Sequence, residues 1–178
     1  LNGLDMRISS QVVHYQASFS NQGASHDLSG RIDHHMAFEI EMADVYSPRY
    51  LRHGPSFQVL DKVMVTDEGL FVGRCHLNDF SLSSIGMVNQ IAVLTEGVFQ
   101  LTGLMVTWGD LVSLVPIGVR EIVSMEARLS ETVIIVTSPI RKEKEPERWT
   151  SDIEVFNLDR KLCLRFRGVA GMKMESYH

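Results

Sequence analysis

The sequence is poor in cysteine and has no uninterrupted apolar run of about 18 residues, the length from which a membrane-spanning helix is inferred. Its two cysteines, Cys75 and Cys163, each lie in an alternating apolar run, which favours buried thiols in a reducing compartment over a disulfide framework. No basic-then-apolar leader opens the chain either. We therefore expect no membrane span and a cytoplasmic protein.

Positive charge is also scarce, because 17 lysines and arginines face 22 aspartates and glutamates, which gives a formal net charge of -5. No basic stripe is visible, and phosphate recognition normally needs a basic face, so the sequence argues against nucleic-acid binding. The 178 residues are enough for one sizeable core, and the start at Leu1 rather than Met suggests either a piece of a longer polypeptide or a trimmed or disordered start. We expect a single domain over 1–178, with lead-in strands and a loop in 1–45 and the main body in 46–178.

Strands are predicted on both sides of one long apolar segment. In 56–78 two β-rich runs flank Thr66-Asp67-Glu68-Gly69, where Gly69 can take the positive φ of a tight hairpin. The preceding segment 46–57 contains two prolines and a glycine, which predicts irregular structure or a short helical turn. The charged segment 141–148 is predicted to be a solvated hairpin loop. Further strands are expected at 11–20, 34–42, 117–128, 132–140, 149–158 and 161–174.

The segment from about Ser83 to Trp108 predicts a helix, since it is long, free of proline and apolar on almost every side. Ser83 and Ser84 are plausible N-caps. A helix without a wide polar face must be covered by other elements, and one such helix followed by a series of strands fits best in the concave face of a curved antiparallel sheet. The sequence thus predicts an α+β hotdog fold with a long central helix.

Polar side chains form one line on this apolar helix. At 100° per residue Asn89, Glu96, Gln100 and Gly103 fall within roughly 60° of one another. A carboxylate in apolar surroundings normally raises its pKa or finds hydrogen-bond donors, and a carboxyl group that holds its proton is what a general acid requires. The alternative is that Glu96 lies at a helix or subunit contact and only specifies packing.

Two glycines accompany these polar residues within the helix. A glycine in a helix interior costs roughly 1 kcal/mol relative to alanine. Gly97 and Gly103 therefore indicate close approach by a ligand or a backbone, or else tight packing of the helix against the sheet.

With these residues the chain resembles a known family. "LTEGVFQLTG" is similar to the central-helix signature of hotdog dehydratases acting on 3-hydroxyacyl thioesters, in which an acidic residue is followed four positions later by glutamine. "RHGPSFQVLDKVMVTDEGLFVGRCHLN" resembles the hairpin that opens the second hotdog of polyketide synthase dehydratases and polyunsaturated-fatty-acid synthase dehydratases. His53 stands where that Tyr-Gly-Pro-x-Phe-Gln element has tyrosine, and the matching residues are Gly54, Pro55, Phe57 and Gln58. The resemblance extends from about Tyr50 to Met174.

The resemblance implies a dehydratase mechanism. A histidine removes the α-proton of the 3-hydroxyacyl thioester, Glu96 protonates the departing hydroxyl, and Gln100 holds Glu96 in place. The residues implied to bind substrate are His53, Gly54, Pro55, Phe57, Asn89, Gly97 and Gly103. No metal and no cofactor are implied, because the substrate is carried on the phosphopantetheine of an acyl carrier protein. Polyketide dehydratases usually have aspartate at the place of Glu96, so the resemblance at this position is closer to the bacterial fatty-acid type or to polyunsaturated-fatty-acid synthases.

The catalytic histidine has no clear counterpart in the chain. The family motif His-x-x-x-Gly-x-x-x-x-Pro is incomplete here, since His26 and Gly30 are followed by His35 in place of proline. His53 is the best candidate within the chain, but we expect the base to come from a second hotdog, upstream or in a dimer partner. Two other functions remain open: a hotdog thioesterase that uses Glu96 on water or on the thioester, and a non-catalytic hotdog that binds acyl chains or serves in dimerisation. Histidines occur at His14, His26, His34, His35, His53, His76 and His178.

Overall fold

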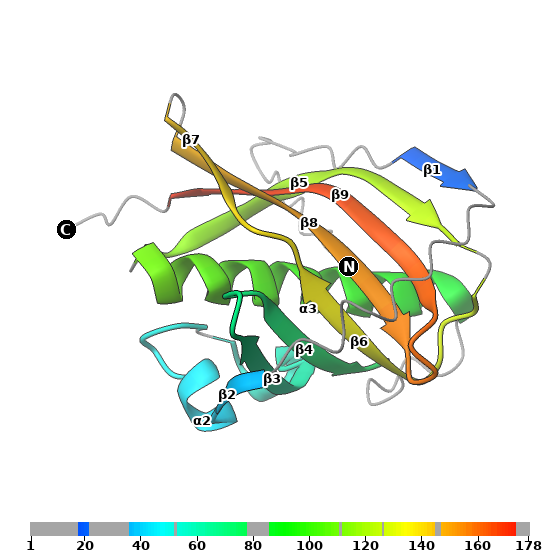
Figure 1. Ribbon diagram of the computed structural model, residues 1–178, viewed down its shortest axis with the longest axis horizontal. Coiled ribbons are helices and arrows are strands. Elements are labelled where there is room, and N and C mark those ends of the chain that lie inside the picture. The colour runs from blue at the N-terminus through cyan, green and yellow to red at the C-terminus, as the bar shows by residue number, and fades with distance from the viewer. Residues whose placement is uncertain are drawn as a thin grey trace, which may run out of the picture.

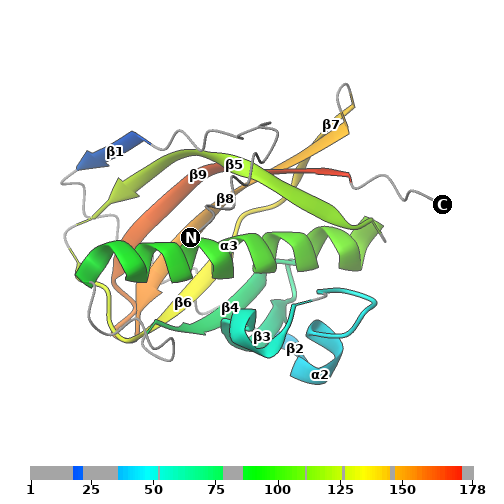
Figure 2. The same ribbon diagram turned by 180° about the vertical axis from the view of Figure 1, so that it is seen from behind.

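The computed structural model describes residues 18–21, 36–51, 53–77, 86–110, 112–125, 127–144 and 147–173. These residues form one nine-stranded sheet and a long helix, α3 (Gly86–Asp110), which lies along one face of the sheet (Figures 1 and 2). Two short helices, α2 (Met42–Val45) and the 3-10 helix η1 (Pro55–Phe57), lie between the second and third strands. The strands are β1 (Ser18–Asn21), β2 (Met36–Ile40), β3 (Leu60–Thr66), β4 (Phe71–His76), β5 (Leu114–Ser124), β6 (Thr132–Thr137), β7 (Arg141–Lys144), β8 (Glu147–Asn157) and β9 (Leu162–Lys173).

The strand order is β1-β5-β9-β8-β6-β4-β3-β2, with β7 paired to β8 outside this path. The β1–β5 pair is parallel and the other pairs are antiparallel. In Figure 2 α3 stands in front and the curved sheet crosses behind it, from β5 and β9 on one side to β3 and β4 on the other. This is the predicted α+β hotdog arrangement, and it follows from burying one long apolar helix against one antiparallel sheet.

The β3–β4 hairpin is confirmed at the predicted place. Thr66 N–H donates to the carbonyl of Leu70 at 2.9 Å, and Gly69, which adopts φ 76°, donates to the carbonyl of Thr66 at 2.9 Å. Glycine takes this left-handed conformation without the steric cost that a side chain brings. The hairpin therefore places β3 and β4 side by side beneath α3.

The core lies between α3 and the sheet. The sheet-facing residues of α3 include Leu94, Val98, Leu101 and Leu104, each with no exposed surface. The segment Gln90–Gly109 is long and apolar enough to cross a membrane by length and composition, yet 61% of it is buried within the protein. Burial on this scale is what the core helix of a folded domain requires, so the apolar composition of α3 is explained by the sheet it covers.

One face of α3 is less buried than the sequence pattern predicts. Residues that are exposed or half-buried recur at helical spacing along it, namely Ala92, Thr95, Glu96, Phe99 and Gly103. The sheet covers the opposite side of the helix (Figure 2). The helix is thus not surrounded on all sides by the described part of the chain, and Glu96 lies on this more open strip.

Two local predictions are wrong. The strand predicted at 117–128 begins earlier, at Leu114, so that Pro116 lies within β5 at a register shift between Pro116 and Gly118 opposite β9, where a residue without an N–H is tolerated. The charged segment 141–148 is a pair of strands and not a loop, because β7 pairs with the start of β8. Lys142 Nζ there lies 4.7 Å from the ring centre of the buried Trp149, so its ammonium group makes a cation–π contact with that ring.

Other predictions are confirmed or lie outside the described residues. Cys75 and Cys163 are free and buried, as expected. Strands also form at most of the other predicted places, whereas residues 11–17 and the proposed N-caps Ser83 and Ser84 lie outside the described residues. The same holds for the histidines of the incomplete motif and for five of the seven histidines, which are His14, His26, His34, His35 and His178.

Candidate active site

The segment 46–60 crosses the side of α3 and brings two groups to it. The first and last residues of this segment, Tyr46 and Leu60, contact each other. Tyr46 Oη accepts a hydrogen bond from the N–H of Leu60 at 2.8 Å and lies 3.1 Å from the carbonyl oxygen of Leu60. Between these ends lie His53, whose carbonyl accepts a bond from Gln58 Nε2 at 3.0 Å, and η1 with the carbonyl of Phe57. Proline at the start of η1 has the fixed φ that suits a helical first turn.

The side chain of Gln100 makes more hydrogen bonds than any other side chain that lines the cavity in the described part of the chain. It is only 2% exposed, and its Nε2 donates to the carbonyl of Phe57 and to Glu96 Oε1, the latter at 2.8 Å. Its Oε1 accepts a bond from Tyr46 Oη at 2.9 Å. Both amide hydrogens and the amide oxygen of Gln100 are thus engaged, which is the condition for burying an amide without a free-energy penalty.

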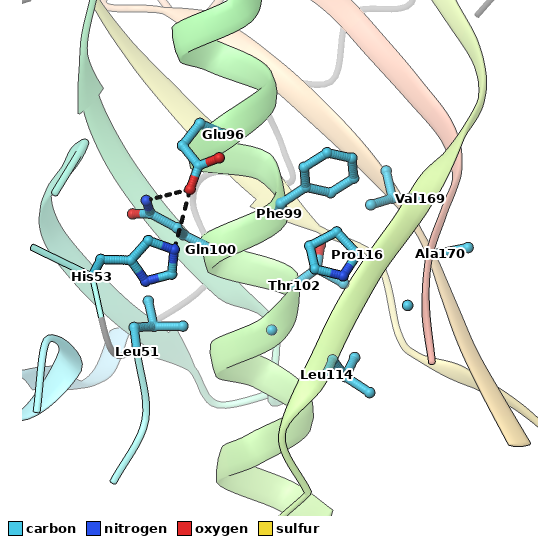
Figure 3. A pocket seen from close by; sticks show the side chains of 12 residues that line it. Leu51, His53, Glu96, Phe99, Gln100, Thr102, Leu114, Pro116, Val169 and Ala170 are labelled. Atoms are coloured by element: carbon cyan, nitrogen blue, oxygen red, sulfur yellow. Dashed lines mark hydrogen bonds and ion pairs between the residues drawn. The ribbon is translucent and has the colours of Figure 1, made fainter. Parts of the chain in front are cut away.

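Glu96 lies one helical turn before Gln100 and faces His53. His53 Nε2 is 3.3 Å from Glu96 Oε1, and the two side chains are 32% and 35% exposed. Figure 3 shows Gln100 and His53 converging on the same carboxylate oxygen, while the second oxygen points away from them towards the side of Phe99. Glu96 thus lies at the mouth of a pocket instead of being fully buried, with the amide of Gln100 as a donor and the imidazole of His53 beside it.

Below this carboxylate a cavity of about 80 Å³ opens between α3, the 46–60 segment and the strands β5 and β9. Its walls are mostly apolar, with Glu96, His53, Gln100 and Thr102 as the polar groups. Figure 3 shows Leu51 and His53 on one side of α3 and Pro116, Val169 and Ala170 on the other. The remaining lining residues are Phe99, Gly103, Leu114 and Gly171. A cavity of this kind suits an apolar chain that ends in a polar reactive group.

Four of the predicted site residues meet at this cavity, namely Glu96, Gln100, His53 and Gly103. Phe57 takes part through its carbonyl, while its ring is 62% exposed and does not line the cavity. An alanine Cβ at Gly103 would lie 3.8 Å from Leu51, an ordinary contact, so the absence of a side chain there widens the cavity without being demanded by packing.

The other predicted binding residues are not brought to the cavity. Gly54 and Pro55 are exposed and do not line the cavity. Gly97 faces the sheet, where an added Cβ would lie 3.2 Å from Ile135 Cδ1, so its small size serves helix-to-sheet packing and not a ligand. Asn89 belongs to the first turn of α3, and its side chain lies outside the described residues.

Several residues that complete the site could not be predicted from local sequence patterns. Tyr46 is 54 positions from Gln100, and Val169, Ala170 and Gly171 come from the last strand. Only the register of β9 against β5 places the latter three beside α3, and no local pattern encodes that register. Within the described residues no group of three or more His, Cys, Asp or Glu side chains could hold a metal ion.

A family model described as the polyketide synthase dehydratase N-terminal domain matches residues 40–176, which is more than half of the chain. The chain belongs to the polyketide synthase dehydratase family. The description names the N-terminal domain, so this match does not support the assignment to the second hotdog, which stays a prediction. Among the curated proteins none matches the chain.

Solved polyketide synthase dehydratases share the fold. The dehydratase domain from the CurH module of Curacin polyketide synthase has a TM-score of 0.64 at 15% identity, over 86% of this chain and 54% of that one. The dehydratase domain of RzxB from Pseudomonas fluorescens gives 0.60 at 16%, over 85% and 54%. That of PpsC from Mycobacterium tuberculosis, solved in complex with C12:1-CoA, gives 0.56 at 17%, over 77% and 52%. The chain thus spans about half the length of the dehydratase domains it matches.

Proposed function

We propose that this polyketide synthase dehydratase chain forms one half of an active site that converts 3-hydroxyacyl thioesters into 2-enoyl thioesters. In that reaction a base takes a proton from C2, the C2–C3 double bond forms, and the C3–O bond breaks as the hydroxyl takes up a proton and leaves as water. The elimination of water is redox-neutral, and the two protons that move need only a base and an acid, so the proposal invokes no redox cofactor and no metal. The thioester is carried on the phosphopantetheine of an acyl carrier protein.

The observation that carries this proposal is the arrangement of Glu96 at the mouth of an apolar cavity. Gln100 and His53 both contact Oε1 of Glu96, at 2.8 and 3.3 Å, and fix the direction of the carboxyl group. The second oxygen remains available to hold the proton that the departing hydroxyl needs (Figure 3). We assign Glu96 the role of general acid and Gln100 that of its positioning residue.

The base is proposed to be a histidine of a second hotdog. In support, CurJ and CurK dehydratases in which a histidine is replaced by phenylalanine are described as inactive mutants. This chain covers about half of those domains, so a companion half has room to supply such a residue. His53 is the candidate within the chain, because C2 and C3 are adjacent atoms and a base beside Glu96 would be close enough to reach C2–H.

Glu96→Gln tests the proposal. A general acid contributes typically 10²–10⁴-fold, so we expect at least a roughly hundredfold loss of dehydration with an unchanged melting temperature. The assay follows the absorbance of the enoyl thioester formed from a 3-hydroxyacyl pantetheine thioester, with the chain alone and mixed with a hotdog domain that carries the complete histidine motif. Glu39→Gln is the control, because Glu39 is an exposed carboxylate that pairs with Lys62 at 2.8 Å and does not line the cavity.

The outcomes separate the candidate functions. Full turnover by Glu96→Gln contradicts the catalytic role of Glu96. Release of free acid and thiol, detected by mass spectrometry, indicates a thioesterase instead. Turnover by the chain alone that disappears in His53→Gln assigns the base to His53, whereas turnover only in the mixture assigns it to the second hotdog.

A further inference from the structure

We propose that Tyr46 is a positioning residue of the dehydratase site, holding the amide of Gln100 in the orientation that presents its N–H to Glu96. This inference rests on the proposed function for its catalytic consequence, and on the contacts of Tyr46 for its geometry. Tyr46 itself does not line the cavity. It therefore acts through Gln100 and not on the substrate.

The Tyr46 hydroxyl has a single proton to donate. Its oxygen lies 2.9 Å from Gln100 Oε1 and 3.1 Å from the carbonyl of Leu60, and it accepts the N–H of Leu60 at 2.8 Å. Both possible acceptors compete for one proton. Gln100 Oε1 is the nearer acceptor and belongs to an amide that is 2% exposed, and within the described residues the hydroxyl is its hydrogen-bond donor. The proton is thus best placed on the bond to Gln100.

The hydroxyl keeps this proton over the working range of pH. Burial raises the pKa of the Tyr46 phenol above its ordinary value, even though the hydrogen bond to the Leu60 backbone acts in the opposite direction. Tyr46 is therefore a permanent donor to the oxygen of Gln100. An amide oxygen that accepts from Tyr46 leaves the amide nitrogen facing Phe57 and Glu96.

The reverse orientation of the amide is disfavoured for a simple reason. It would place Gln100 Oε1 against the Phe57 carbonyl and the Glu96 carboxylate, which are both acceptors, so the two hydrogen bonds that Nε2 donates would be lost. Without the hydroxyl, the Gln100 oxygen is buried and unpaired unless the side chain turns towards water. In turning it would release Glu96, which then loses one of the two groups that hold its direction.

Tyr46→Phe removes only the hydroxyl and is compared with Tyr50→Phe. The ring of Tyr50 stacks on Trp108 at 5.3 Å between centroids, so the control removes a tyrosine hydroxyl from the same segment and keeps the ring contact. The first readout is independent of activity, namely hydrogen exchange of the Gln100 side-chain N–H₂ measured by NMR on the full chain. We expect slow exchange in the wild type and in Tyr50→Phe, and at least tenfold faster exchange in Tyr46→Phe.

The second readout is the division of the kinetic effect. Since the binding walls are untouched, Tyr46→Phe is expected to lower kcat about tenfold and to leave KM within about twofold. Combined with Gln100→Leu, it should cause no further loss, because both changes remove the same support from Glu96. A residue that served only to close the 46–60 segment would lower the melting temperature, and its kinetic effect would add to that of Gln100→Leu.

Each result decides the matter. Gln100 protons that stay protected in Tyr46→Phe, or additive losses in the double variant, overturn the inference. If Tyr46→Phe does not fold, a difluorotyrosine at position 46 keeps the hydroxyl but has a lower phenol pKa than tyrosine. As the pH rises through that pKa the hydroxyl loses its proton, so the protection of the Gln100 N–H₂ should be lost at a pH where the wild type keeps it. If no variant, wild type included, forms enoyl thioester, the proposed function fails while the exchange measurement still tests Tyr46.

Discussion

Two glycines in α3 allow a comparison of packing, because the gain in helix propensity on replacement by alanine is the same for both and cancels between the two variants. Gly97 and Gly103 both lie in the interior of α3, so replacement by alanine favours the helix by about 1 kcal/mol at either position. Their surroundings differ. At Gly97 the new Cβ would lie 3.2 Å from Ile135 Cδ1 and 3.4 Å from Cys75 Sγ and Val59 Cγ2, whereas at Gly103 the nearest atom is 3.8 Å away on Leu51.

The expected magnitudes follow from these distances. Ile135 and Cys75 have no exposed surface and Val59 is 5% exposed, and the three come from different parts of the fold, so they yield little to an added methyl group. Overpacking of this kind costs about 1–3 kcal/mol. Gly103→Ala should therefore raise the free energy of unfolding by about 1 kcal/mol, and Gly97→Ala should leave it unchanged or lower it by up to about 2 kcal/mol.

The free energy of unfolding is measured by urea unfolding followed by circular dichroism. In thermal unfolding the melting temperature should move by about 2–4 °C per kcal/mol in a chain of this size. Gly109→Ala provides the calibration, since nothing lies within 4 Å of an added Cβ there. A Gly97→Ala variant as stable as Gly103→Ala would contradict this prediction, because α3 would then not pack closely against the sheet at Gly97. Gly103→Ala also narrows the cavity, so acyl thioesters should bind it more weakly.

Two further predictions concern titratable groups away from the cavity. Burial raises the pKa of Cys75 to about 12 and also raises that of Cys163, so both thiols should react with a thiol reagent at pH 8 only after unfolding, and rapid reaction of the native chain would contradict their burial. Burial raises the pKa of Asp61, but the hydrogen bonds and charge of Arg74, together with His76, outweigh it and hold that pKa below its ordinary value. Asp61→Asn should therefore be less stable than the wild type at pH 7. The difference in the free energy of unfolding should shrink as the pH falls below about 4, where the wild-type carboxylate becomes protonated. A difference that does not depend on pH in urea unfolding would exclude the Asp61 charge as its cause.

The fold and the centre of the site could be predicted because both rest on short-range patterns. The Thr66–Gly69 turn, the apolar helix and the Glu96–Gln100 pair involve residues within a few positions of one another, where the helix and strand periods decide which side chains meet. His53 was also found, since it lies in a recognisable Gly-Pro-containing segment. The burial of the sheet-facing side of α3 could be inferred from composition, whereas the more open strip that carries Glu96 could not.

The rest depends on contacts between distant parts of the chain. Gly97 and Gly103 look alike in the sequence, yet one faces Ile135 and the other faces the cavity, and only the seating of the helix on the sheet distinguishes them. Phe57 matches the family motif by its side chain, but the structure uses its carbonyl. The strand at Arg141–Lys144 could not be predicted, because its charged composition indicates a solvated loop. The structure pairs it with β8 at the margin of the sheet, where charged residues are tolerated.

The position of β9 in the sheet has a consequence for synthesis of the protein. Strand β5 joins the sheet through β9, which follows it by about 40 residues and stands between β5 and β8. One wall of the cavity, Val169 to Gly171, is part of β9. A nascent chain emerging from the ribosome thus carries the Glu96 helix and its supporting segment long before it has a closed cavity, and translation must pass residue 171 before the chain can hold an acyl group.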